Sequence, residues 1–212
     1  MTPLFPGIRI EAAELRLVRL PLLTPFVIST GTMTEKVFPL LTLKAEGLEG
    51  YGEGVMDSLP DYLEETQAGA LPFLREALLP QIVGKRFASP AELGAILDPW
   101  RGHRMSKAMV EMAVWDLWAK ALGLPLSAAL GGVRDAVEVG VSLGIADIPR
   151  TLERVREAVE AGYRRIKLKI KHGHDLDLLA AVRTEFPKDK LTVDANTDYR
   201  LNDLPLLKAM DA

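Results

Sequence analysis

The chain has 212 residues, of which 48% are hydrophobic and 26% charged, a composition typical of a soluble globular protein of one or two domains. Its 26 basic and 29 acidic residues give a net charge of −3 without a basic block, which argues against nucleic acid or an anionic membrane surface as a partner. The absence of cysteine excludes disulfides and thiolate metal sites, and no apolar run approaches the roughly 18 residues of a membrane span. We therefore expect a cytoplasmic protein without a secretion signal.

The N-terminal part of the chain predicts a small α+β domain that opens with an antiparallel meander. Pro21 and Pro25 are expected to end its first strand. Residues 24–34 are rich in small and hydroxyl side chains, which is typical of a mobile loop. The predicted strands span residues 8–20, 37–45 and 50–56.

Three helices are predicted to follow the meander. Glu64 and Glu65 lie in the opening turns of the first, where the helix dipole favours negative charge. Ser106 is the expected N-cap of the third, and Gly123 ends it. The third helix carries an apolar stripe that is expected to face the core, made of Met109, Met112, Ala113, Leu117 and Trp118. The three helices are predicted over residues 60–78, 90–97 and 107–122.

Strands and helices alternate after residue 130, which indicates a parallel α/β sheet or barrel. We place the domain boundary there, with an α+β domain over 1–130 and the parallel unit over 131–212. Three strand-helix units are present, whereas a (β/α)₈ barrel needs eight and about 250 residues. Either the fold is a smaller α/β fold or the chain is the front part of a longer barrel. The strands are predicted over 137–145, 166–170 and 191–196, and the helices over 149–161, 176–186 and 203–209.

Two of these strands have one apolar and one polar face, which is unusual for a parallel sheet. Lys167 and Lys169 share a face of one strand, and Asp194 with Asn196 lies on a face of the next. In a closed barrel these side chains would converge at the mouth formed by the carboxyl ends of the strands. An exposed sheet with solvated charges is the alternative that the pattern leaves open.

The residue types on these faces suit proton transfer next to a carboxylate. Two neighbouring ammonium groups disfavour each other's charge, which can make one lysine a base. Asp194 is a hard oxygen ligand suited to Mg²⁺, and a divalent ion can hold the enediolate that results when a proton is removed next to a carboxylate. One aspartate cannot hold Mg²⁺ alone, so further ligands are required.

Five runs give the sequence a resemblance to a known family. They are AMVEMAVWDLWAKALG at 108–123, LGG at 130–132, VEVGVSLGI at 137–145, YRRIKLKIK at 163–171 and LTVDAN at 191–196. In their order and spacing they resemble the enolase superfamily, in the branch of o-succinylbenzoate synthases and N-acylamino acid racemases. The resemblance extends over essentially the whole chain. It implies an α+β capping domain followed by a modified TIM barrel, of which this chain holds about the first three βα units.

The resemblance also implies roles for individual residues. Lys169 would be the acid/base on one face of the substrate, and Lys167 would tune its charge and contact the substrate carboxylate. Asp194 would be the first of three ligands for Mg²⁺, with Mn²⁺ as a possible substitute, and the other ligands are expected beyond residue 212. The residues that would line or close the substrate pocket are Ser142, Gly144, Asn196, Phe26 and Ser29 of the 24–34 loop, and Met56.

Two activities fit this resemblance equally well. One is dehydration of a cyclohexadiene carboxylate to o-succinylbenzoate in menaquinone synthesis, which we favour on biological grounds. The other is racemisation of an N-acylamino acid by two lysines on opposite faces of the substrate. In both cases the partner is a small carboxylate, and we expect a homo-oligomer that binds neither nucleic acid nor membrane. A third alternative is a non-catalytic, truncated module, and the 212 residues alone are expected to be inactive.

The sequence also departs from the family pattern at several positions. After the lysine strand the family usually reads K-P-G-W-D, whereas this chain reads K-H-G-H-D at 171–175, so His172 and His174 replace Pro and Trp. Asp198 stands where a small residue is usual. His172 and His174 could suggest a metal site, but a surface loop is the better interpretation because no other histidine or cysteine completes a ligand shell. These departures concern the loops beside the site and leave the assignments of Lys169 and Asp194 unchanged.

Overall fold

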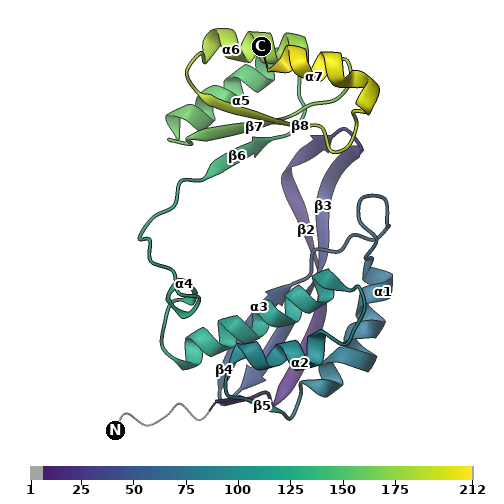
Figure 1. Ribbon diagram of the computed structural model, residues 1–212, viewed down its shortest axis with the longest axis vertical. Helices are drawn as coiled ribbons and strands as arrows, with labels where there is room; N and C mark the ends of the chain where they lie inside the picture. Colours follow the sequence, from purple (N-terminus) through teal and green to yellow (C-terminus); the bar gives the residue numbers. More distant parts are fainter. Residues whose placement is uncertain (1–6, 212) are drawn as a thin grey trace. The chain divides into compact units, whose positions relative to one another are not determined.

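The computed structural model describes residues 7–211, and these form two compact units (Figure 1). One unit contains the chain up to Leu20 together with Val37–Val133, and the other contains Pro21–Lys36 together with the chain from Arg134 onward. Two long strands, β2 (Ala12–Ile28) and β3 (Gly31–Ala45), pass from the first unit into the second. Among the described residues, no helix has the length and hydropathy needed to cross a bilayer.

In the first unit, a helix lies directly on a three-stranded sheet of order β2-β3-β4. The close approach depends on two glycines of β4 (Leu48–Glu53), because a Cβ on Gly52 would lie 1.9 Å from the Met109 carbonyl oxygen and one on Gly50 would lie 2.2 Å from that of Ala113. The side chains that α3 (Arg104–Ala121) buries in the core are Met109, Val110, Ala113, Val114 and Leu117. The predicted stripe is therefore correct in part, and it is wrong for Met112, whose side chain is exposed.

The N-terminus of α3 is capped from a distant segment. Its first turn starts at Arg104, so Ser106 lies inside the helix and is not the predicted cap. The Glu65 carboxylate accepts hydrogen bonds from the backbone N–H of Met105 (2.8 Å) and of Ser106 (3.0 Å), and also from the Ser106 hydroxyl. Glu65 thus does not open the first helix as predicted, since that helix begins only at Gln67, where Thr66 is the N-cap.

The remaining elements of the first unit are short. The described strands are β1 (Ile8–Arg9) and β5 (Arg86–Phe87), which pair with each other, and the helical segments are α1 (Gln67–Pro72), a π-helical turn (Phe73–Leu78), 3-10 turns (Leu79–Gln81 and Pro90–Leu93), α2 (Gly94–Leu97) and α4 (Leu126–Ala129). The predicted second helix therefore corresponds to Pro90–Leu97, formed by a 3-10 turn and α2.

The segment predicted to be a mobile loop is instead the end of the β2–β3 hairpin. Strand β2 continues through Pro21 and Pro25 to Ile28, and the chain turns at Ser29 and Thr30. The prolines do not end the strand because β2 lies at the edge of its sheet, where a residue without an N–H can be accommodated. The hairpin end therefore presents its residues on a regular strand frame.

The second unit contains a parallel sheet of order β6-β7-β8 with helices packed on one face (Figure 1). That face is apolar: Ile166, Leu168 and Ile170 are each 1% exposed and pack against α5 and α6 side chains such as Val155 and Val182. The elements are β6 (Gly140–Leu143), α5 (Ile148–Glu160), β7 (Arg165–Lys169), α6 (Leu176–Glu185), β8 (Lys190–Asp194), a 3-10 turn (Leu201–Asp203) and α7 (Leu204–Met210). The alternation predicted for this region is confirmed, although β6 is shorter than the predicted strand over 137–145.

Candidate active site

The register of the parallel sheet brings the predicted polar residues into two rows on one face. Ser142 of β6 pairs with Lys167 of β7, which pairs with Thr192 of β8. In the next row, Lys169 pairs with Asp194 at the carboxyl ends of their strands. Since paired residues of neighbouring strands point to the same side of a sheet, the two lysines and the aspartate share the face opposite the helices.

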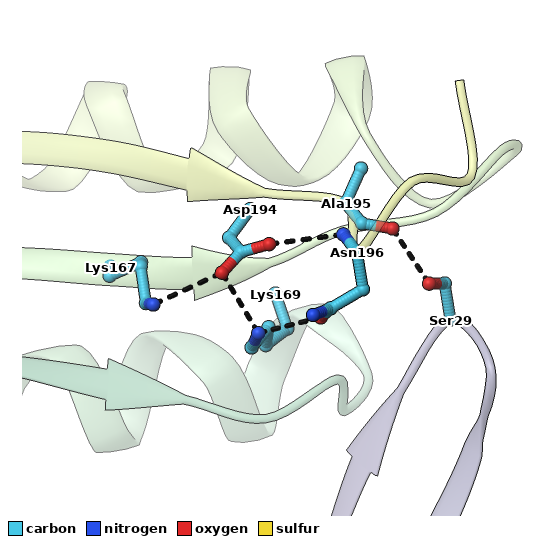
Figure 2. Close-up of polar contacts among 6 residues, drawn as sticks. All are labelled: Ser29, Lys167, Lys169, Asp194, Ala195 and Asn196. Carbon is cyan, nitrogen blue, oxygen red and sulfur yellow. Dashed lines mark hydrogen bonds and ion pairs between the residues drawn. The ribbon is translucent and has the colours of Figure 1, made fainter. Parts of the chain in front are cut away.

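Asp194 is the centre of this cluster (Figure 2). Its Oδ2 atom accepts from Nζ of Lys169 at 2.9 Å and from Nζ of Lys167 at 3.0 Å, while Oδ1 accepts from the backbone N–H of Asn196 at 3.0 Å. Lys169 also donates to Oδ1 of Asn196 at 2.6 Å. The lysines differ in environment, because the Lys169 side chain is 8% exposed and that of Lys167 is 39% exposed.

These contacts hold Asp194 in its ionised form. Burial by itself would raise the pKa of the Asp194 carboxyl, but the hydrogen bonds from Lys169, the Asn196 backbone and Lys167 outweigh it and lower the pKa to about 2. Two ammonium groups face one carboxylate, so the cluster keeps a net positive charge. Such a face attracts an anionic ligand, and the contacts described use two of the three hydrogens on Nζ of Lys169.

The end of the β2–β3 hairpin packs on the carboxyl ends of the same strands, within the same unit. The Ser29 hydroxyl donates to the Ala195 carbonyl at 2.7 Å (Figure 2), and the Ile145 N–H donates to the Val27 carbonyl at 2.9 Å. A Cβ on Gly144 would lie 3.1 to 3.3 Å from atoms of Val27 and from the Phe26 ring, so glycine there allows the hairpin to approach. The structure therefore brings Phe26, Ser29 and Gly144 together at these strand ends.

Two other predicted residues differ in their setting. Ser142 lies beside Lys167 in the register, and its buried Oγ has no hydrogen-bond partner among the described residues, so it can donate to or accept from a ligand. Met56 belongs to the first unit, where its side chain is fully buried and its carbonyl accepts from the Gln67 amide. A role for Met56 at the pocket remains a prediction.

The donor chemistry fits a divalent cation only in part. Asp194 offers hard carboxylate oxygens, which Mg²⁺ prefers, and one of them already accepts from two lysines. In the part of the chain covered by the structure, no group of three or more acidic or histidine side chains could hold a metal ion. Asp194 can thus supply one ligand, and these residues do not complete a metal centre.

Sequence reasoning missed the acceptor of Ser29 and the strand geometry of the hairpin that carries it. The family resemblance, and not the residue pattern, placed Ser29 at the predicted pocket. Ser29 contacts the backbone carbonyl of Ala195, which lies 166 positions away. The composition of neither segment indicates this contact.

Models of two known protein domain families match the chain. The model of the mandelate racemase / muconate lactonizing enzyme N-terminal domain matches residues 12–131, and the enolase C-terminal domain-like model matches residues 150–211. The chain belongs to the enolase superfamily. Its fold is an N-terminal domain followed by part of a C-terminal domain, built of mixed sheets and helices.

Several similar proteins bear the names of the predicted branch of this superfamily. It is 55% identical over 96% of its length to an N-succinylamino acid racemase of Thermus thermophilus, and spans 55% of that protein. It is 42% identical over 95% of its length to an o-succinylbenzoate synthase of Enterococcus faecalis, and spans 56% of that protein. The chain therefore covers about half the length of these relatives.

Solved structures of superfamily members have the same fold. An enolase superfamily member from Listeria innocua matches with a TM-score of 0.88 at 38% identity, covering 96% of this chain and 56% of the other. A dipeptide epimerase from Enterococcus faecalis, solved with Mg and the dipeptide L-Leu-L-Tyr, matches with a TM-score of 0.84 at 27% identity, covering 97% of this chain and 57% of the other.

Proposed function

We propose that the protein is a Mg²⁺-dependent enzyme that removes the proton α to the carboxylate of a succinyl-bearing substrate. The observation that carries the proposal is the nearly buried Lys169, held against Asp194 and Asn196 at the carboxyl end of β7. A lysine fixed in this way can present Nζ to a substrate carbon in one orientation. The relatives support the substrate class, because the N-succinylamino acid racemase and the o-succinylbenzoate synthase are both named after succinyl compounds.

The residues of the cluster have separable roles in this proposal. Lys169 must first release one proton from the ammonium group that contacts Asp194 and Asn196. As a neutral amine it then takes the α proton at Nζ while the electrons of the C–H bond pass toward the substrate carboxylate. Lys167 faces the same region and binds the carboxylate by charge, and Ser142 and Asn196 offer hydrogen bonds that orient it. Phe26, Ser29 and Gly144 exclude water at the strand ends, with Met56 as a further proposed contact.

A bound divalent cation, with Asp194 as one ligand, would stabilise the negative charge that develops on the substrate carboxylate. The epimerase that was solved with Mg supports this choice of metal, and Mn²⁺ is a plausible substitute by ligand chemistry. The two further ligands remain a prediction. Oδ1 of Asp194 accepts one hydrogen bond in the described contacts, so it would be the atom with a lone pair left to hold the cation.

The first candidate reaction is the synthase dehydration. After Lys169 has taken the α proton, the adjacent C–O bond breaks, and the leaving hydroxide takes the proton from Nζ, which releases water and the aromatic o-succinylbenzoate for menaquinone synthesis. The second candidate is racemisation of an N-succinylamino acid, favoured by the 55% identical relative. It requires a second proton donor on the opposite face of the substrate, which Lys169 cannot supply.

The decisive experiment is to assay the complete purified protein with Mg²⁺ on both substrates, following o-succinylbenzoate by its absorbance and racemisation by loss of optical rotation. We expect turnover of at least one of them and loss of turnover with a chelator. If neither substrate reacts, and neither exchanges its α proton with D₂O, the enzyme proposal fails and the non-catalytic module is the better description.

We extend the proposal to features of the whole protein. We propose that the three parallel strands are the opening units of a modified TIM barrel and that residues 1–130 form an α+β capping domain. A small carboxylate substrate, a homo-oligomeric state, a cytoplasmic location and the absence of nucleic-acid or membrane partners belong to the same proposal. Gel filtration with light scattering tests the oligomeric state.

A further inference from the structure

His172 joins the two loops that follow β7 and β8. Its Nδ1 atom lies 3.1 Å from Oδ2 of Asp198, and its Nε2 atom lies 3.2 Å from Oδ2 of Asp203. The backbone N–H of His172 also donates to Oδ2 of Asp198 at 2.8 Å. The imidazole therefore bridges two carboxylates from a segment that is 26 or more positions away in the sequence.

This arrangement requires a charged imidazole. Ionised carboxylates only accept hydrogen bonds, and a neutral imidazole carries a single N–H, so one ring nitrogen would face a carboxylate with its lone pair. The imidazolium donates from both nitrogens and satisfies Asp198 and Asp203 together. The other titratable groups around it are Tyr199, whose ring lies 4.4 Å from the imidazole, and Lys171, which attracts Asp198.

The bridged segment includes a strained turn directly after β8. Asn196 and Thr197 have φ angles of 47° and 67°, in the left-handed region. Asparagine tolerates this region better than most residues, whereas Thr197 is β-branched and therefore strained there. This turn places Oδ1 of Asn196 2.6 Å from Nζ of Lys169. Asp198 is the next residue after the strained pair, so a contact that holds Asp198 also holds the turn closed.

A second contact supports the same segment. The Tyr199 hydroxyl donates to Oδ2 of Asp175 at 2.7 Å, and Oδ1 of Asp175 accepts from the Leu176 N–H at the start of α6. Asp175 is buried, so this contact anchors the segment to the helix.

We propose that His172 is a positioning residue whose imidazolium bridges Asp198 and Asp203 and so fixes the turn that presents Asn196 to Lys169. The turn then depends on pH. The hydrogen bonds that the imidazolium donates to Asp203 and Asp198 raise the pKa of His172 above its ordinary value, and burial opposes them. Because the pKa of the folded form is raised, the bridge is complete below the ordinary histidine pKa of about 6.5 and is lost as the pH rises through the raised value.

The first test measures the turn without reference to catalysis. Amide hydrogen exchange of residues 195–199 is followed by NMR from pH 5.5 to 9 in the complete protein and in His172→Gln, Asp198→Asn and the double variant. Corrected for intrinsic rates, exchange in the wild type should rise about two- to fivefold across the His172 titration, as expected for a solvent-accessible ion pair. His172→Gln should show the faster exchange at all pH values, and the double variant should add nothing to it.

His174→Gln is the matched control, since this histidine lies in the same loop and does not contact Asp198 or Asp203 in the described contacts. It should keep the pH step of the wild type. The inference is overturned if His172 titrates at or below about 6.5, or if His172→Gln leaves exchange at the turn unchanged.

The second test concerns catalysis and rests on the proposed function. On the succinyl substrate, KM of the wild type should rise about two- to fivefold above the His172 titration, and His172→Gln should have the high KM at all pH values. A KM step that persists in His172→Gln overturns the positioning role. If the wild type turns over neither substrate while the exchange data show the step, the proposed function fails and the bridge between the loops stands.

Discussion

The ionisation of Asp194 gives a direct measure of how tightly the lysines surround it. Its pKa falls from 3.8 to about 2, although burial opposes the fall, because Lys169, the Asn196 backbone and Lys167 donate to it. At 1.36 kcal/mol per pKa unit this corresponds to roughly 2.5 kcal/mol, and exposure of 30% of the side chain reduces the expected net contribution to about 1 kcal/mol. Because the pKa of the folded form is lowered, this stabilisation is present above pH 3.8 and is lost as the pH falls toward 2.

The assay is an NMR titration of the carboxyl carbons in metal-free protein. At pH 3 a group with a pKa of 2 is about 90% ionised, whereas one with a pKa of 3.8 is about 15% ionised, so a single spectrum separates the two cases. Urea unfolding measures how much ionised Asp194 contributes to stability. Asp194→Asn should lose about 1 kcal/mol of unfolding free energy near pH 5 and less at pH 3.

Two lysine variants are matched controls for this prediction. Lys169→Gln should raise the Asp194 midpoint more than Lys167→Gln does, because the Lys169 side chain is 8% exposed and that of Lys167 is 39% exposed. A midpoint near 3.8 in the wild type would refute the proposed cluster, as would equal effects of the two substitutions.

Two substitutions test the surrounding frame. Glu65→Ala removes the acceptor of three donors at the start of α3, including the buried Ser106 hydroxyl. The free energy of unfolding in urea should fall by about 2 to 3 kcal/mol. A fall of less than about 0.5 kcal/mol would contradict the capping role. Gly144→Ala places a Cβ 3.1 Å from the Val27 carbonyl oxygen and should destabilise the protein by about 1 to 3 kcal/mol. Gly69→Ala in α1 is the control, because its Cβ would lie 3.7 Å from Oγ1 of Thr66, and it should be neutral or stabilising. Equal effects of the two substitutions would argue against the tight hairpin contact.

The sequence predicted the polar face of the parallel sheet because that face depends on local rules. Alternation along a strand separates Lys167 and Lys169 from Ile166 and Leu168, and parallel pairing then aligns Lys169 with Asp194. The family resemblance implied which of these residues is the base and which is a metal ligand. Membership of the enolase superfamily is confirmed by matches to both domains. These predictions required no knowledge of long-range contacts.

Several of the errors share a physical cause, since they concern residues whose partners are distant in the sequence. Pro21 and Pro25 suggested the end of a strand, but whether a proline breaks a strand depends on the edge position of that strand in the sheet. Glu65 was assigned to its own helix, whereas its carboxylate caps a helix 41 positions later. The interpretation of His172 as part of a surface loop is correct, since its side chain is exposed, but nothing in its local sequence predicts the bridge to Asp198 and Asp203.

The most direct test of the central claim is exchange of the substrate α proton with D₂O, catalysed by the complete protein with Mg²⁺. Lys169→Arg keeps the positive charge but cannot serve as a neutral amine base, because arginine stays protonated in proteins. The proposal predicts that the wild type exchanges the proton and that Lys169→Arg does not, with exchange reduced at least about a thousandfold. Exchange at a wild-type rate in this variant would show that Lys169 is not the base and would contradict the proposed mechanism.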